Sequence, residues 1–290
     1  MMKSMLCVLM GFIFYSARGQ EQFQLERPLA KELKEISGTV KDGDVLWAIT
    51  DARGSIYKLD LKGNVIQELK LENVRLTDVE AVAADSKYLY VGDIGDNKGI
   101  RNDRVVVRIL KSSIDRSATS IGGEQIRFSF PDAASASNQK ANNLDCEAMI
   151  SYGDSLYLFT KRDDMRTGVY ALSKTPGTHV ARHKGEFKTK GLITDASVNL
   201  RGNEISLVGY DNGHRRPFVW VLSDFTGDNF FSGKQERFEL THKKNLDWQV
   251  EGISYRDEAS YFISCEKTRD VPNTLYVIQK AGLLNEGKAD

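Results

Sequence analysis

The chain has 290 residues, of which 40 are basic and 40 acidic, so its formal net charge at neutral pH is zero. It has no block of basic residues, and this argues against a surface that follows the phosphates of a nucleic acid. Hydrophobic residues make up 41% of the chain. That is enough for a large core, and all-β chains of this length often form one domain.

The first segment predicts export. Residues 1–19 hold an early lysine, an apolar run over residues 5–15 and a small-x-small motif at residues 17–19, a combination typical of a secretory signal peptide. An uncleaved anchor is the alternative, but the apolar run is shorter than the roughly 20 residues that cross a bilayer. We expect a domain over residues 20–290 that is periplasmic or secreted, without a membrane span. Its two cysteines, Cys146 and Cys265, fall in non-adjacent repeats, so we expect buried thiols rather than a disulfide.

One unit recurs five times along the chain. Each copy has an apolar strand that contains a polar-then-small pair, a turn, an aromatic strand, another turn and a third strand. The pairs are Ser37-Gly38, Glu80-Ala81, Glu147-Ala148, Asp195-Ala196 and Glu251-Gly252. In the first, second, third and fifth copies, the tenth residue after the polar member is an aromatic residue of the next strand. The remaining copy has Ile205 at that position. Repeats of about 40–55 residues with three or four strands each are typical of a β-propeller.

The count of strands indicates how the ring closes. Fourth strands are predicted over residues 65–71, 126–130, 181–187 and 235–241, but the fifth copy lacks one. Residues 22–26 form an unused strand, and pairing it with the last blade would remove the exposed sheet edges. We therefore predict an all-β fold, a single five-bladed propeller closed by the N-terminal strand. Six blades, with the extra strands inside residues 110–143, or two packed β-sandwiches are the alternatives.

The repeated polar residue predicts an acidic central channel. The first strand of every propeller blade lines this channel, so the following side chains should converge: Ser37, Glu80, Glu147, Asp195 and Glu251. Like charges in a poorly solvated site need compensation by a hard cation, by raised pKa values or by basic side chains. A Ca²⁺ ion suits such a ring because it takes six to eight oxygen ligands. The alternatives are structural pairing, with backbone N–H groups or with Lys161 and Lys267, and a catalytic role.

Charged and polar residues also gather where the second strands end. The rim residues with a predicted role in ligand binding are Asp51, Asp93, Asp96, Asn97, Arg101, Lys161, Asp211 and Lys267. Turn chemistry alone also explains several of them, because glycine, aspartate and asparagine favour tight loops. Asp78 and Asp145 lie two residues before Glu80 and Glu147, on the same strand face, and could add a second carboxylate layer.

The catalytic motifs with a clear mechanism are missing from the sequence. It contains no G-x-S-x-G, Walker A or HExxH motif. A metal-activated water with Glu80 or Glu251 as general base is the mechanism that remains. Two hypotheses follow: a binding or scaffold protein that holds Ca²⁺ and an unknown small molecule or envelope protein, or a metal-dependent hydrolase of a phosphoester or lactone at the channel mouth.

Two stretches resemble a family of uncharacterised secreted propeller-like proteins of Bacteroidetes-type bacteria. The family reads close to N-x-D-W-E-D-I-A and I-Y-I-G-D-I-G-N-N, where this chain has D-V-E-A-V at residues 78–82 and Y-V-G-D-I-G-D-N at residues 90–97. Val79 stands in place of the family's tryptophan. The resemblance implies fold and export rather than activity. More distantly, residues 249–253 look like a segment of calcium-activated nucleotidases, and the ring is similar to that of lactonase-like propellers but lacks their asparagine.

Overall fold

The computed structural model describes residues 23–51, 54–131, 144–243 and 246–286, and the predicted signal peptide lies outside them. This part of the chain consists mainly of β-strands. Its helices are α1 (Lys280–Glu286) and two short 3₁₀ helices, Lys31–Leu33 and Lys111–Ser113. None of the helices in these ranges is long and apolar enough to cross a membrane.

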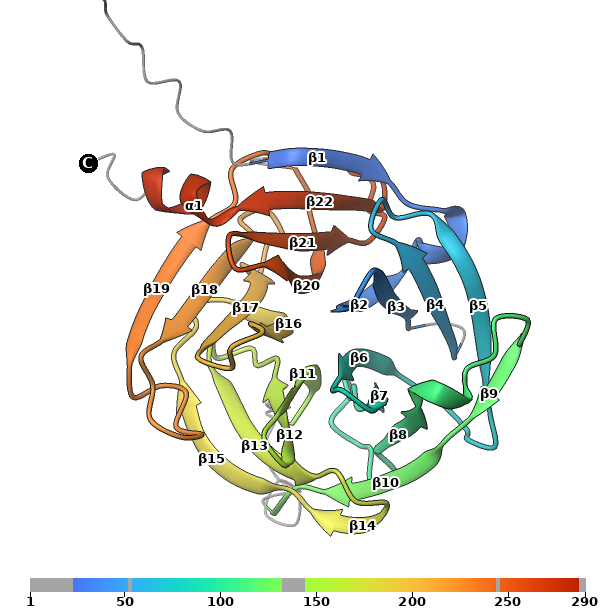
Figure 1. The fold of residues 1–290 in the computed structure, drawn as a ribbon. Coiled ribbons are helices and arrows are strands. Elements are labelled where there is room, and N and C mark those ends of the chain that lie inside the picture. Colours follow the sequence, from blue (N-terminus) through green and yellow to red (C-terminus); the bar gives the residue numbers. More distant parts are fainter. Residues whose placement is uncertain (1–22, 52–53, 132–143, 244–245, 287–290) are drawn as a thin grey trace, which may run out of the picture.

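The strands form five sheets that surround one axis, so the predicted five-bladed propeller is confirmed (Figure 1). In order from the axis outward, the first sheet contains β2 (Ile36–Asp42), β3 (Val45–Thr50), β4 (Ser55–Asp60), β5 (Val65–Glu72) and β9 (Ser120–Gly122). The second contains β6 (Val79–Ala84), β7 (Tyr88–Asp93), β8 (Val105–Leu110), β10 (Glu124–Ser129) and β14 (Gly177–Val180). The third contains β11 (Cys146–Tyr152), β12 (Ser155–Thr160), β13 (Thr167–Ser173) and β15 (Arg182–Phe187). The fourth contains β16 (Leu192–Val198), β17 (Glu204–Tyr210), β18 (Phe218–Ser223) and β19 (Lys234–Glu239).

The fifth blade joins the two ends of the described chain. It contains β20 (Val250–Asp257), β21 (Ser260–Cys265), β22 (Thr274–Gln279) and, at its outer edge, β1 (Phe23–Pro28). Because β1 pairs antiparallel with β22, the predicted closure by the N-terminal strand is confirmed. The innermost strands complete the ring, since each of them contacts the innermost strands of both neighbouring blades.

Two short outer strands link neighbouring blades. Strand β9 leaves the second blade and pairs in parallel with β5 of the first. Strand β14 leaves the third blade and pairs in parallel with β10 of the second. The segment that could have hidden a sixth blade therefore supplies β9 and β10 to existing sheets, and residues 132–143 of it lie outside the described ranges.

The hydrophobic core is divided among the blade interfaces. Five clusters of buried side chains occur, and each one joins the facing sides of two neighbouring sheets. The aromatic residues of the ten-residue step belong to them, as Trp47, Tyr90, Tyr157 and Tyr261 do. Cys146 and Cys265 are buried free thiols, as expected.

Each innermost strand carries a β-bulge at the same place. The pairing of the first and second strands skips one residue in every blade, and the skipped residues are Ser37, Glu80, Glu147, Thr194 and Glu251. A bulge leaves its extra residue unpaired and re-aims the side chain. The predicted register is therefore wrong in the fourth blade, where Thr194 takes the place assigned to Asp195. A longer hairpin, in which the Asn199 side chain accepts hydrogen bonds from the N–H groups of Asn203 and Glu204, changes the spacing there.

The closing strand gives a stability prediction. The Phe23 ring packs against His242, Trp248 and Tyr276, with ring centroids 4.6, 5.9 and 5.5 Å away. Phe23→Ala should lower the free energy of unfolding by about 1–3 kcal/mol, because a partly buried aromatic side chain loses its contacts. Chemical denaturation measures this. Gln24→Ala is the control and should lose less, since its exposed side chain only accepts a hydrogen bond from Gln279. Equal losses in the two variants would contradict the role of β1 in closure.

Candidate functional site

Most of the predicted ring converges on one polar cavity. Ser37, Glu80, Glu147 and Glu251 line a hollow of about 140 Å³ at one end of the channel. Six carboxylates face it against one ammonium group: Glu35, Asp51, Glu80, Glu147, Glu251 and Glu266 against Lys161. The bulges place the four ring residues here, because each interrupts its strand at the same height along the axis.

Asp195 has a different position. It is fully buried and is absent from the lining of the cavity. Its carboxyl accepts hydrogen bonds from the N–H groups of Ala196 and Ile253, both at 2.8 Å, and from that of Thr39 at 3.4 Å. Asp195 therefore ties the fourth blade to the fifth and the first. The bulge residue of its strand, Thr194, donates its hydroxyl hydrogen to the carbonyl oxygen of Val250 at 2.6 Å.

Lys161 supplies part of the charge compensation. Its Nζ lies 3.5 Å from Glu147 Oε2 and 5.7 Å from the centre of the Tyr210 ring. Burial alone would lower the pKa of Lys161, but Glu147, Tyr210, Glu251 and Glu80 together raise it well above its ordinary value. The lysine is therefore a cation held among the ring carboxylates.

Protonation is the second form of compensation. Burial raises the pKa of Glu251 to about 7 and that of Glu266 to about 7. Burial, reinforced by the Glu147 charge, raises the pKa of Asp145 to about 8. Burial also raises the pKa of Glu80 well above its ordinary value, with Glu147 and Asp78 adding to the effect. Near neutral pH, Glu251, Glu266 and Asp145 are poised to lose or gain a proton.

A tighter acidic cluster lies at the edge of the cavity. Asp51, Asp78 and Glu80 each have a carboxylate oxygen within 4.8 Å of the others. Glu80 is only 7% exposed. Within the described ranges, none of the three carboxylates accepts a hydrogen bond or forms an ion pair. Gly95 packs directly on this cluster, since a Cβ at that position would lie 2.6 Å from Asp78 Oδ2.

A second hollow of about 330 Å³ adjoins the first. The two share Asn97, Lys161, Tyr210 and Gln249 in their linings. The Tyr210 hydroxyl donates to Glu251 Oε1 at 2.8 Å, and the Gln249 amide lies 2.9 Å from the Nδ1 atom of His214. Together these groups form a polar recess around the acidic ring.

The remaining rim residues serve the loops or face solvent. Asp93 accepts both N–H hydrogens of a bidentate Arg101 contact at 3.0 Å, and it also accepts the N–H of Asp78 at 2.7 Å. Asp96 pairs with Arg104, and Asp211 accepts the N–H of Arg215 at 2.9 Å. Lys267 is exposed and is absent from the cavity linings. Of the predicted rim, Asp51, Asn97 and Lys161 reach the cavity.

Sequence reasoning missed Glu35, Tyr210 and Gln249. A signal for two of them exists, because Glu35 and Gln249 lie two residues before a bulge, as Asp78 and Asp145 do. Tyr210 lies one position beyond the residue that pairs directly before the bulge, which is the position of Asp51, Lys161 and Glu266 in their blades. Position within the repeat, rather than residue type, was the useful guide.

Comparisons with known proteins give only distant structural similarity. No protein-family model matches the chain, and no curated protein matches it by sequence. Among solved structures, it is similar to the PQQ-bound aldose sugar dehydrogenase of Streptomyces coelicolor, with 11% identity, 87% of this chain and 96% of that chain covered, and a TM-score of 0.49. A streptogramin B lyase has 13% identity and a TM-score of 0.42, with 86% of this chain and 71% of that chain covered. Hydrazine synthase of Kuenenia stuttgartiensis has 12% identity and a TM-score of 0.43, with 87% of this chain covered. This chain spans 65% of that one.

The raised pKa of Glu251 gives a pH prediction. Because the folded state favours its protonated form, the stability that Glu251 contributes is full below pH 4.5 and is lost as pH rises through about 7. The variant Glu251→Gln lacks this loss. Its unfolding free energy relative to that of the wild type should therefore be higher at pH 8 than at pH 5 by roughly 2–3 kcal/mol. Urea unfolding at both pH values measures this gain. Glu72→Gln, at an exposed position, should show none; an equal gain there would contradict the assignment.

Proposed function

We propose that this protein is an exported binding propeller that holds a hard divalent cation, with Ca²⁺ as the first candidate, at Asp51, Asp78 and Glu80. The observation that carries the proposal is the close approach of three carboxylates that have no donor in the described ranges. Two oxygens on opposite sides of a bound Ca²⁺ lie about 5 Å apart, which suits this spacing. The signal-like N-terminus and the resemblance to secreted propeller proteins support export.

The charge pattern favours the cluster over the centre of the ring. Lys161 already lies among the ring carboxylates, and a second cation there would meet its charge. Lys161 forms its ion pair with Glu147 and forms none with Asp51, Asp78 or Glu80 in the described residues. Of the predicted metal ligands, Glu80 therefore keeps that role, while Glu147 and Glu251 serve Lys161. Oxygen donors of this kind suit Ca²⁺ better than zinc.

Calorimetric titration of chelator-treated protein with CaCl₂ tests the proposal. The wild type should bind one Ca²⁺, and Glu80→Gln and Asp78→Asn should each weaken binding at least tenfold because a charged ligand is lost. Binding should be tighter at pH 8 than at pH 6, since protons compete for Glu80. Asp154→Asn, in an exposed turn, should bind like the wild type. No binding heat, together with equal melting temperatures in calcium and in chelator, would refute the site.

A second function, metal-assisted hydrolysis of a phosphoester or lactone, is favoured by one observation. Glu251 lines the same cavity as Asp51 and Glu80 and has a pKa near 7, which suits a general base at neutral pH. A panel of phosphoesters and lactones with added Ca²⁺ should then show turnover that Glu251→Gln lowers at least a hundredfold. No turnover, or turnover that neither Ca²⁺ nor Glu251→Gln changes, would refute this second function.

A further inference from the structure

Another cavity, separate from the two hollows at the acidic end, lies at the opposite end of the channel. It has a volume of about 460 Å³, and all five innermost strands line it. On each strand its residues lie two or more positions beyond the bulge, whereas the acidic cavity is lined by the bulge residues themselves. The two cavities share no residue. Asp195, one position beyond the bulge and fully buried, lies between them along the strand direction.

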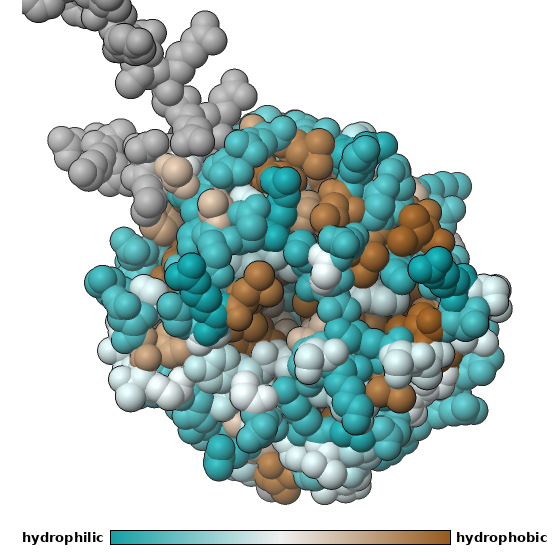
Figure 2. Space-filling view, in the orientation of Figure 1, coloured by the Kyte–Doolittle hydropathy of each residue, from teal (hydrophilic) through white to brown (hydrophobic). Residues whose placement is uncertain are grey.

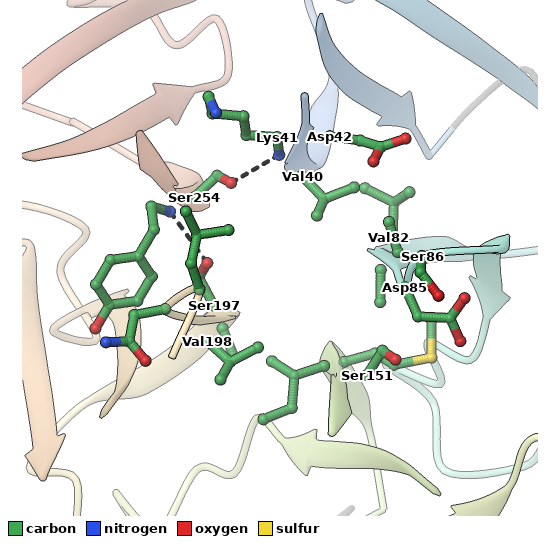
Figure 3. A pocket seen from close by; sticks show the side chains of 18 of the residues that line it. Val40, Lys41, Asp42, Val82, Asp85, Ser86, Ser151, Ser197, Val198 and Ser254 are labelled. Atoms are coloured by element: carbon green, nitrogen blue, oxygen red, sulfur yellow. Dashed lines mark hydrogen bonds between the residues drawn. The ribbon is translucent and has the colours of Figure 1, made fainter. Parts of the chain in front are cut away.

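The wall of this cavity combines aliphatic side chains with polar ones. Val40, Val82 and Val198 surround its centre in Figure 3, and Met149 and Ile150 belong to the same lining. Figure 2 shows hydrophobic residues near the middle of the molecule among a mainly hydrophilic surface. The volume falls within the range of pockets that enclose small organic ligands, about 300–1,000 Å³, and such pockets are mostly apolar.

Neutral hydroxyls are among the polar groups that line the cavity. Ser254 Oγ accepts the N–H of Lys41 at 2.8 Å, and Ser197 Oγ accepts the N–H of Tyr255 at 3.1 Å (Figure 3). In the described part of the chain neither hydroxyl donates a hydrogen bond, so each still has a hydrogen to offer. A ligand oxygen that accepts a hydrogen bond would use it.

The charged side chains of the lining are Asp42, Asp85 and Lys41, and each is either ion-paired or points away from the centre of the cavity. Lys111 Nζ lies 2.7 Å from Asp42, and Lys174 Nζ lies 3.2 Å from Asp85. The side chain of Lys41 points away from the centre of the cavity in Figure 3. An ionic ligand would lose its hydration shell without gaining a charged partner, and burial of an unpaired charge is costly.

From this arrangement we infer a binding site for a neutral small molecule that has a compact apolar body and a carbonyl or ether oxygen. The aliphatic side chains of the wall contact the body, and the Ser197 and Ser254 hydroxyls donate to the oxygen. The site is independent of the cation site, because the cavities share no residue and Asp195 separates them.

Camphor is a suitable probe, since it combines a compact aliphatic cage with one ketone. Titration followed by protein NMR should show saturable one-to-one binding of camphor and at least tenfold weaker binding of camphorsulfonate, which has the same cage and a negative charge. Val198→Phe and Val40→Phe fill the cavity and should each weaken camphor binding at least tenfold. Val180→Phe, on the exposed outer strand β14, is the matched control and should bind like the wild type.

Three results would overturn the inference: no camphor binding up to its solubility limit, equal binding of camphorsulfonate, or unchanged binding in both cavity-filling variants. Melting curves of the variants establish that they fold. If one valine variant fails to fold, the other still decides the question. Removal of calcium should leave camphor affinity unchanged, so failure of the cation site and failure of this site are distinguishable.

Discussion

The space around the axis of the ring is too narrow for five ordinary side chains at one height. A Cβ on Gly252 would lie 2.8 Å from Thr39 Oγ1, and Gly38 already approaches the backbone of Glu80. Small residues therefore follow the bulge in four blades: Gly38, Ala81, Ala148 and Gly252. Asp195 is the exception, and it uses the room that the two glycines leave. Its carboxyl reaches the N–H groups of Thr39 and Ile253, the residues directly after those glycines.

This crowded layer divides the channel, and the division explains how so much acid can be buried. On the side of the bulges the carboxylates share a confined volume with Lys161, so their charges are balanced by one ammonium group and by raised pKa values. Buried charges that lack a partner cost several kcal/mol each, and protonation relieves that cost. Asp51, Asp78 and Glu80, the three donor-free carboxylates at the edge of the cavity, form no ion pair with Lys161 in the described residues.

The fold could be predicted from the sequence because its signals are local and repeated. A ten-residue step, strand-like alternation and one unpaired N-terminal strand sufficed for five blades and their closure. The register failed only where the local rule changed, at the longer hairpin between β16 and β17. Nothing in the residue type distinguishes Asp195 from Glu80, because which of two neighbouring polar residues bulges depends on the pairing of the whole hairpin.

The candidate site was harder to predict, because charge partners come from different blades. Asp93 is the last residue of β7, and Asp51 directly follows β3. Asp93 meets Arg101 from its own loop, whereas Asp51 meets Asp78 and Glu80. Lys161 was predicted both as a rim charge and, together with Lys267, as a partner of the ring carboxylates; it pairs with Glu147, whereas Lys267 is exposed. Such pairings depend on contacts distant in sequence. The pattern within a single strand is easier to read. Strands β6 and β11 each have a glutamate at the bulge, in the half that faces the acidic cavity, and apolar residues at the next three positions, in the half toward the other cavity. Substitutions in one half can therefore change one end of the channel while the layer of Asp195 and the glycines holds the other end in place.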